Sequence, residues 1–379
     1  MGVNRVDFGT LPRELEEIRQ EVEGYARAEG LDYPEVCFVM LDFNQMNQVA
    51  AYDGFPSRYP HWRFGMECER LRKSYAWGLH RIYEMVVNTD PCYAYLLVSN
   101  LPIDQKLVMA HVYGHVDFFK NNAYFAHTTR KMMDEIANHG SRVRRYVERF
   151  GEDEVETFVD RCMSIDDLID IHSVAIRRRP EVSRYDFNDQ QAEEESPNRF
   201  KSKDYMADYL NPPEVMRAEE EEQRKQKEKV AERHYPERPE KDVLLFLIEH
   251  APMRSWQRDI LSIVRDEAYY FYPQAQTKII NEGWASYWHS TIMTQKALAP
   301  AELIDYADHH SGTMATSGKR LNPYKLGIEL LRDVEDRWNK GRFGPEYDNC
   351  DDLATKRQWN KNLGLGRQKI FECRRVHND

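Results

Sequence analysis

Residues 107–122, with the sequence LVMAHVYGHVDFFKNN, constrain the fold of this chain more than any other segment. Within this apolar run, His111 and His115 stand four positions apart. That spacing places two side chains one turn apart on the same face of an α-helix. Leu107 and Phe118 fall on the same face, so we expect the two imidazoles on a buried stripe of a helix.

A buried histidine pair has two interpretations. The two rings can be core histidines whose nitrogens are satisfied by ordinary hydrogen bonds, and in a chain with 13 histidines such a pair can arise by chance. Each buried imidazole nevertheless needs partners for both ring nitrogens. A shared metal ion satisfies two rings on one stripe most simply, as in the zinc-binding helix motif H-E-x-x-H.

A metal site of this kind needs a third protein ligand, and the segment KIINEGWASYWHS supplies a candidate in Glu282. Glu282, Ser286 and His289 recur at near-helical intervals on a face that also carries Ile279. A carboxylate on an apolar face is costly unless it binds a metal or pairs with Lys or Arg. Gly283 inside this helix costs about 1 kcal/mol relative to Ala. It therefore indicates a close backbone approach, for which the histidine helix is the candidate.

Other polar side chains could serve the same site. His289 lies seven residues after Glu282, roughly 10 Å along the helix axis, which suits proton transfer better than coordination of the same ion. His310 in DHHSG and His61 in YPHWRFG either line the pocket or make structural hydrogen bonds. Asp117, six residues after His111, points about 240° round the helix, and we assign it a surface or capping role.

The surrounding pattern predicts a small sheet followed by helices. Residues 10–30 alternate apolar and charged positions at helical spacing, with Gly30 as the expected stop. The runs VCFVML and CYAYLLVS are short and rich in β-forming residues, which is typical of strands. Asp104 is expected to cap the histidine helix, and residues 121–122, both Asn, to end it.

These elements predict an α+β fold that is predominantly α-helical, with a small sheet beside a pair of metal-binding helices. Residues 1–179 are expected to form an N-terminal α+β half that carries the histidine helix. Residues 180–241 are dense in charges of both signs and predict a linker or insertion. Residues 242–379 are expected to form a helical half that carries the glutamate helix.

Composition narrows the functional classes. A net charge of −11 and the lack of a basic track argue against nucleic acid as a partner, because that affinity depends on Lys and Arg. No run approaches the ~18 apolar residues of a membrane span, and the N-terminus lacks the apolar core of a secretory signal. We therefore expect a cytoplasmic protein. The six cysteines are far apart and form no C-x-x-C pair, so we expect them to be reduced core residues.

A family resemblance runs through nearly the whole chain. AHVYGHVDFFKNN, NEGWASYWH, YPHWRFG, DPCYAYL, SWQRDIL, YFYPQ and NPYKLG together closely resemble the stage V sporulation protein R (SpoVR-like) family, in matching order. This resemblance implies a bacterial cytoplasmic protein tied, in spore formers, to assembly of the spore cortex peptidoglycan, with a serine protein kinase pathway as a possible partner. Family members usually continue well past a segment like KIFECRRVHND, which leaves open whether a further C-terminal domain belongs to the protein.

A looser resemblance concerns mechanism. MAHVYGH and NEGWASYW are similar to the two zinc-ligand helices of glutamate-zincin aminopeptidases, which implies a zincin-like core with His111, His115 and Glu282 as ligands. Val112 stands where those peptidases carry the glutamate that acts as general base. The ligand helices are also 167 positions apart (282 minus 115), much farther than in the peptidases. The resemblance therefore supports a metal site more than peptidase chemistry.

The sequence thus predicts a zinc-dependent hydrolase of an amide bond, acting on a peptidoglycan-related or peptide substrate. Two imidazoles and a carboxylate also suit iron, manganese or nickel. The alternative is a non-catalytic regulatory or scaffold protein in which the metal only pins the two halves together. His289 distinguishes the two: a fourth ligand favours the scaffold, whereas a free neighbour favours catalysis, with His310 as a second catalytic candidate.

Overall fold

The fold is described from a computed structural model, whose described residues are 11–76, 84–173, 221, 241–315 and 321–379. Contacts divide the chain into two compact units. The first comprises Met1–Asp166 and Arg254–Asp379, and the second comprises Asp167–Met253. The charged segment predicted at residues 180–241 lies outside the described residues except for positions 221 and 241, so the predicted domain scheme stays a prediction.

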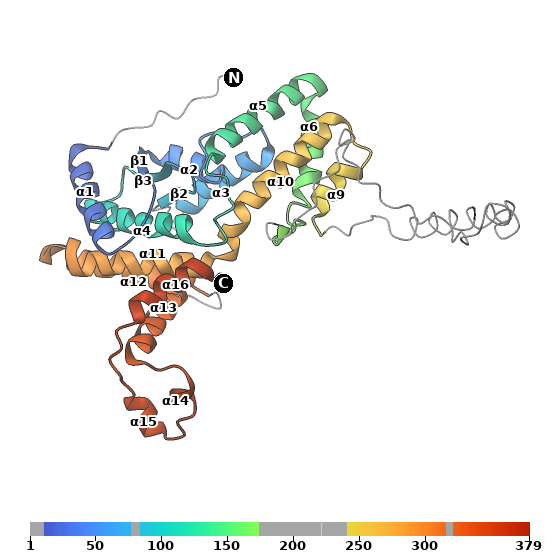
Figure 1. The fold of residues 1–379 in the computed structure, drawn as a ribbon. Helices are drawn as coiled ribbons and strands as arrows, with labels where there is room; N and C mark the ends of the chain where they lie inside the picture. Colours follow the sequence, from blue (N-terminus) through green and yellow to red (C-terminus); the bar gives the residue numbers. More distant parts are fainter. Residues whose placement is uncertain (1–10, 77–83, 174–220, 222–240, 316–320) are drawn as a thin grey trace, which may run out of the picture. The chain divides into compact units, whose positions relative to one another are not determined.

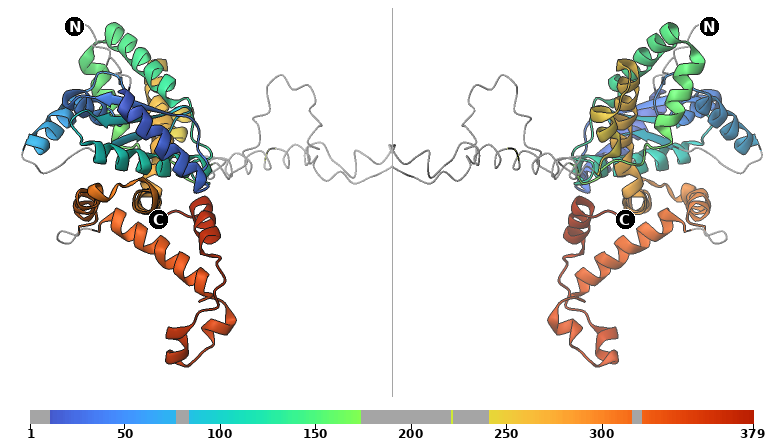
Figure 2. Two further views of the ribbon diagram at one scale, coloured as in Figure 1. Left: turned by 90° about the vertical axis from the view of Figure 1, so that its left-hand side faces the viewer. Right: turned by 90° about the vertical axis from the view of Figure 1, so that its right-hand side faces the viewer.

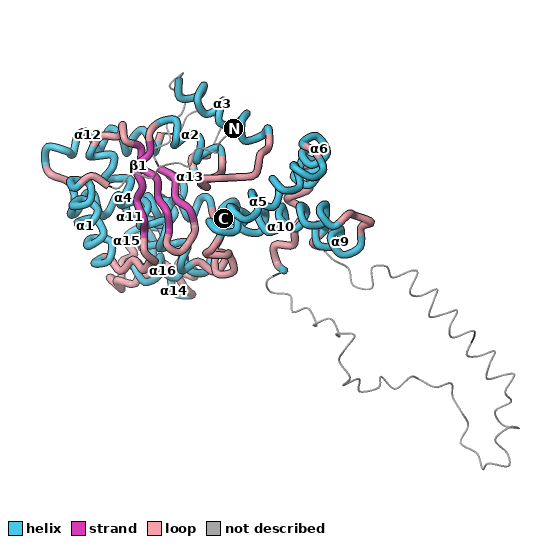
Figure 3. Tube along the Cα trace, turned by 90° about the horizontal axis from the view of Figure 1, so that it is seen from above, coloured by secondary structure: helices cyan, strands magenta, loops and turns pink. Residues whose placement is uncertain are grey.

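A three-stranded sheet forms near the start of the first unit, as the sequence predicts. Its strands are β1 (Val36–Leu41), β2 (Glu84–Val87) and β3 (Cys92–Leu97), in the order β1-β3-β2 (Figure 3). β1 pairs with β3 in parallel, and β2 pairs with β3 in antiparallel. The runs VCFVML and CYAYLL are therefore neighbouring strands, and the prediction of a predominantly helical α+β fold with a small sheet is confirmed.

The other elements among the described residues of the first unit are helices (Figure 1). The helix predicted over residues 10–30 is α1, which begins directly after Pro12, and Gly30 follows its end with φ +84°. The helix α1 spans Arg13–Ala28. Before residue 174 it is followed by α2 (Phe43–Ala51), α3 (Trp62–Ala76), α4 (Pro102–Asn121), α5 (Met132–Phe150) and α6 (Glu152–Met163). After residue 253 the helices of this unit are α10 (Ser255–Gln276), α11 (Lys278–Ile292), η3 (Met293–Ala297), η4 (Pro300–Glu302), α12 (Leu303–Met314), α13 (Pro323–Lys340), α14 (Pro345–Asp348), α15 (Leu353–Gln358) and α16 (Gly366–Val376). The second unit contains α9 (Val243–His250).

The histidine helix is α4, and it is buried along most of its 20 residues. It ends at Asn121 with Asn122 as the C-cap, as the sequence predicts. Its start differs from the prediction, because Leu101 is the N-cap and Pro102 occupies the first turn. Proline suits that position, since the missing N–H has no partner within the helix. Asp104 is therefore not the cap, and its carboxylate instead pairs with His309 of α12.

The glutamate helix α11 lies between α4 and α13, and small residues allow both contacts. A Cβ at Gly114 of α4 would lie 2.7 Å from the Cα of Ala285, and a Cβ at Gly283 would lie 2.5 Å from the Cα of Gly327 on α13. The close approach predicted at Gly283 therefore exists, but its partner is α13 rather than the histidine helix. Both side views in Figure 2 place α13, in orange, on the side of α11 away from α4, whereas α16, in red, contacts α4 as well as α13.

One hydrophobic cluster joins α1, the sheet, α4, α11, α13 and α16 around this helix stack. All six cysteines are free thiols, as the sequence predicts, but only Cys92 and Cys162 are buried core residues and the other four are partly exposed. Among the described residues, no helix is both long enough and apolar enough to cross a membrane. The cluster therefore places the two predicted ligand helices side by side in the interior of the first unit.

Candidate metal centre

The three predicted ligands meet in the interior between α4 and α11. His111, His115 and Glu282 are all buried, and one ligand atom from each lies within 4.8 Å of the other two. Glu282 Oε2 is 3.5 Å from His111 Nε2 and 3.4 Å from His115 Nε2. Two segments that are far apart in the sequence therefore bring two imidazole nitrogens and one carboxylate oxygen to a common point.

These separations fit a bound metal ion. Ligand atoms that each lie 2.0–2.1 Å from a tetrahedral zinc ion are separated from one another by about 3.3–3.4 Å. The same separations are long for an N–H···O hydrogen bond, which is usually close to 2.9 Å. Glu282 Oε2 is buried and accepts no hydrogen bond from the residues that the structure describes. The group could thus hold a divalent ion with little rearrangement.

The second oxygen of the glutamate carboxylate has a different partner. Lys278, one turn earlier on α11, places its Nζ 2.5 Å from Glu282 Oε1, and its side chain is 59% exposed. The sequence left open whether Glu282 binds a metal or pairs with Lys or Arg. The structure shows Oε1 paired with Lys278 and Oε2 facing the two imidazoles. Burial alone would raise the pKa of Glu282, but His115 and His111 outweigh burial and hold that pKa well below its usual range. The carboxylate is therefore ionised at neutral pH.

Hydrogen bonds from α11 hold the far side of each imidazole. His115 Nδ1 lies 2.9 Å from Asn281 Oδ1, and His111 Nδ1 lies 2.8 Å from His289 Nδ1. Because the amide oxygen is an acceptor, His115 donates its Nδ1 proton to Asn281, which leaves Nε2 as the atom that would bind a metal. Such partners behind the ligands fix the tautomer and the ring orientation in metal sites. Asn281 was not predicted, although an amide beside Glu282 on a buried helix was a usable signal.

His289 and His310 continue the line of imidazoles away from the ligands. His289 Nε2 lies 3.2 Å from His310 Nδ1, and His310 is partly buried on α12, where it stacks on Tyr306. Burial, with His111 and His310 as further causes, holds the pKa of His289 well below its usual range. The ring is therefore neutral at pH 7. It lies behind His111 and is not among the three residues whose ligand atoms converge.

Two aromatic rings flank the ligand imidazoles. Phe119 stacks on His115, with ring centroids 6.1 Å apart, and Tyr324 lies 6.1 Å from the ring of His111. Tyr324 belongs to the NPYKLG segment at the start of α13. Phe119 follows His115 by four residues on α4, so helical spacing accounts for that contact, whereas the contact of Tyr324 depends on how α13 packs.

Two other candidates have different surroundings. His61 is buried, and its Nε2 lies 3.2 Å from Asp160 of α6, so it makes the structural contact that was one of its two interpretations. Asp117 was predicted to have a surface or capping role, and this is wrong. It points away from the ligands, as its position on the helix requires, but it is fully buried and bonds with Trp284 and Arg374. The prediction failed because the far face of α4 is covered as well.

These features define a predominantly helical α+β protein with a buried candidate metal centre made of two histidines and one glutamate. The model of the SpoVR like protein family matches residues 10–379, so the chain belongs to this family, as its motifs predicted. It is also similar to the Escherichia coli (strain K12) protein described as "Uncharacterized protein YcgB", with 35% identity over 338 residues. This match covers 83% of the chain and 62% of the relative, so the chain spans less than two thirds of that relative's length. No solved structure matches the chain.

Proposed function

We propose that this protein is a metal-dependent hydrolase that cleaves an amide bond in a peptidoglycan-related or peptide substrate. The observation that carries the proposal is the convergence of His111, His115 and Glu282 from two helices, with separations that suit a shared ion. Three protein ligands leave one position of a tetrahedral ion for water or substrate, which is the pattern of catalytic zinc sites. The substrate class rests on the association of the family with spore cortex formation, and a serine protein kinase pathway partner remains a prediction on the same ground.

Each residue of the proposed site would have its own role in the reaction. His111, His115 and Glu282 would hold the ion, with zinc as the first candidate and iron, manganese or nickel as others. When bound, zinc supplies a Lewis acid that polarises a carbonyl and lowers the pKa of water to about 7. Val112 cannot accept a proton at the position where a peptidase of the zincin type carries its base. Another group has to move the proton.

His289 and His310 are the candidates for this proton transfer. If His111 Nε2 faces the ion, its Nδ1 carries the proton and donates to His289 Nδ1, which are 2.8 Å apart. His289 then carries its own proton on Nε2 and donates to His310 Nδ1 at 3.2 Å. All hydrogen bonds in this line run in one direction, from the ligand to the partly exposed helix α12. Because Nε2 of His111 would face the ion, this line cannot receive a proton from bound water through His111 itself. We therefore propose that His289 orients His111, and that the His289–His310 pair accepts the proton from water or substrate at the α12 end of the line.

Metal analysis tests the site. Elemental analysis of the purified protein should find about one equivalent of metal, and the His111→Ala and Glu282→Ala variants should lose it. His139→Ala is the matched control, because His139 is an equally buried histidine that bonds with Glu267. Equal metal content in the wild type and the two ligand variants would refute the ligand assignment.

A second measurement separates the hydrolase from the alternative, a non-catalytic scaffold stabilised by its metal. Two features favour the scaffold. All three ligands are buried, and Val112 stands where a peptidase of the zincin type has its base. X-ray absorption of the zinc-loaded protein should show two imidazoles, one carboxylate and a further light atom from water. Release of free amines from peptidoglycan stem peptides by wild type but not by Glu282→Ala would support the hydrolase, whereas four protein ligands and no amine release would support the scaffold.

A further inference from the structure

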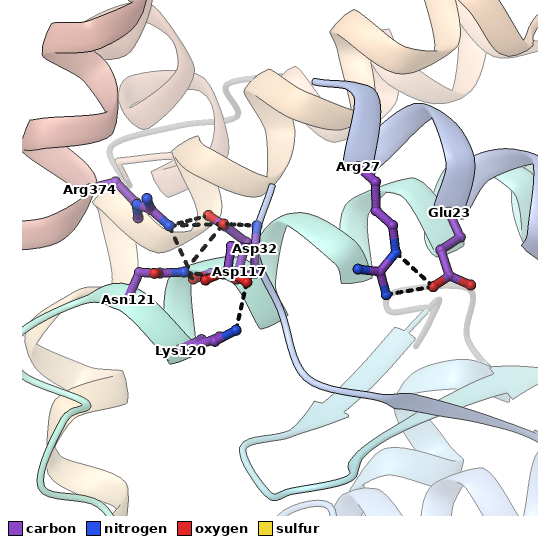
Figure 4. Close-up of polar contacts among 7 residues, drawn as sticks. All are labelled: Glu23, Arg27, Asp32, Asp117, Lys120, Asn121 and Arg374. Carbon is purple, nitrogen blue, oxygen red and sulfur yellow. Dashed lines mark hydrogen bonds and ion pairs between the residues drawn. The ribbon is translucent and has the colours of Figure 1, made fainter. Parts of the chain in front are cut away.

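A buried polar cluster joins the two ligand helices on the side away from the ligands. Asp117 of α4 accepts a hydrogen bond from Trp284 Nε1 of α11 at 2.8 Å. Both oxygens of the same carboxylate lie 2.8 Å from Arg374 Nη1 of α16. Its Oδ1 also accepts the backbone N–H of Asp32, again at 2.8 Å. Figure 4 shows Asp117 beside Arg374, Asp32 and Asn121.

The position of the cluster in the sequence relates it to the metal centre. Asp117 follows His115 by two residues, and Trp284 follows Glu282 by two residues. Two residues correspond to about 200° around a helix, so these side chains leave their helices on faces nearly opposite to the ligands. The Asp117–Trp284 bond and the ligand group therefore join the same two helices on opposite sides, with the close contact of Gly114 and Ala285 between them.

The cluster is costly, which indicates that it has a specific role. Asp117 is fully buried, and the Arg374 side chain is 10% exposed. The guanidinium lies over the rings of Trp284 and Phe371, at 5.5 and 5.1 Å from their centroids. Replacing a buried ion pair by apolar side chains often leaves stability unchanged or improved, and the best-supported use of buried polar groups is to fix the register of helices.

We propose that Asp117 is a positioning residue for the metal centre, which sets the register of α4 against α11 and so brings the ligand atoms to a common point. This inference rests on the proposed metal binding. A metal site tolerates displacements of only about 0.5 Å, so a sliding of one helix along the other would separate Glu282 from the histidines. The bond to Trp284 opposes sliding, and the bond to Arg374 holds the carboxylate in place from α16.

Zinc affinity is the readout that a merely structural role would not change. The probe is Zn²⁺ alone, measured by competition with a chromogenic chelator at a temperature where each variant is folded. Asp117→Asn and Trp284→Phe should each weaken zinc binding by about 10- to 100-fold, the range for partners that orient ligands. Trp284→Phe keeps a large aromatic ring and changes no charge, so its effect cannot come from the loss of a negative charge near the ion.

The control is Glu267→Gln, which disturbs the buried ion pair of Glu267 with Arg58. It should lower the melting temperature and leave zinc affinity within about twofold of the wild type. The double variant Asp117→Asn/Trp284→Phe should lose less affinity than the sum of the two single losses, because both act on the same bond. Trp284→Phe removes its donor, and Asp117→Asn leaves one acceptor oxygen where the carboxylate offers two.

The outcomes separate the two proposals. If the wild type binds zinc and both single variants bind it equally well despite a lower melting temperature, the cluster only braces the fold and the positioning role is wrong. If the wild type binds no transition metal, the proposed metal centre fails, and the positioning role fails with it. A change in the visible spectrum of the Co²⁺-loaded Trp284→Phe protein would add support, because that spectrum reports the ligand geometry.

Discussion

At the scale of single residues, the candidate centre depends on side chains that are not metal ligands themselves. Asn281 and His289 bond to the Nδ1 atoms of the two ligand histidines, so Nε2 of each ring faces Glu282. The spacing of His111 and His115 made the histidines predictable from sequence, since four residues on a helix define one face. Asn281 was not predicted, and Asp117 was wrongly assigned a surface or capping role, because the partners of both side chains lie on other segments of the chain.

One prediction at this scale concerns Asn281. Replacing it by Ala removes the acceptor behind His115, so the ring can rotate and the zinc affinity should fall by about 10-fold. Asn281→Asp keeps an acceptor oxygen and should retain most of the affinity. Competition titration with a chromogenic chelator measures both variants. An unchanged affinity of Asn281→Ala would show that the amide has no part in holding the ligand.

A second prediction concerns His289. His289→Gln keeps a polar group behind His111 but interrupts the line of imidazoles that leads to His310. We expect zinc to remain bound with affinity reduced about 10-fold or less. Any amide hydrolysis should fall by about 10²- to 10⁴-fold, the usual effect of losing a proton-transfer group. A variant that keeps the wild-type rate and pH profile would exclude the proton-transfer role.

At the scale of helices, glycine decides how closely the ligand helices pack. The sequence indicated that something approaches Gly283, because glycine is unfavourable in a helix interior. The prediction that the histidine helix is the approaching element was wrong, since both α4 and α13 carry a glycine that permits a close approach. The structure shows Gly327 of α13 against Gly283, and Gly114 of α4 against Ala285. The strands and the C-terminal ends of α1 and α4 were more predictable, because their sequence signals are local.

Glycine substitutions test this packing. A Cβ at Gly327 would lie 2.2 Å from the carbonyl oxygen of Ile279, so Gly327→Ala should force α13 away from α11. We expect a loss of about 1–3 kcal/mol in the free energy of unfolding, as for other overpacked cores. The measurement is urea denaturation followed by circular dichroism.

Gly24→Ala is the matched control, because Gly24 lies inside α1 and a Cβ there meets nothing within 4 Å. Alanine favours the helix, so this variant should gain about 0.5–1 kcal/mol in the free energy of unfolding. If Gly327→Ala were equally stabilising, the close contact of α11 and α13 would be wrong.

At the scale of the whole molecule, the centre connects residues that are 167 positions apart (282 minus 115). Family membership was evident from the order of motifs along the chain, whereas the convergence of the ligands required the packing of α4 and α11. A ligand that binds only the folded state stabilises it, by about 2.7 kcal/mol at a free concentration 100 times its Kd.

Thermal unfolding should therefore depend on metal. Added zinc should raise the melting temperature of the wild type, and a chelator should lower it again. The increase should be larger at pH 8 than at pH 6, because metal binding requires deprotonated imidazoles and protons compete at lower pH. Glu282→Ala should show no increase at either pH. An identical response of wild type and Glu282→Ala would place the zinc elsewhere.

The separation of the ligand helices also bears on synthesis. During translation α4 emerges with both imidazoles, but the nascent chain holds no complete centre until Glu282 has left the ribosome. The proposed ion would therefore find its full set of ligands only in a polypeptide that has already joined its early and late helices. Metal occupancy would then report that this joining has taken place.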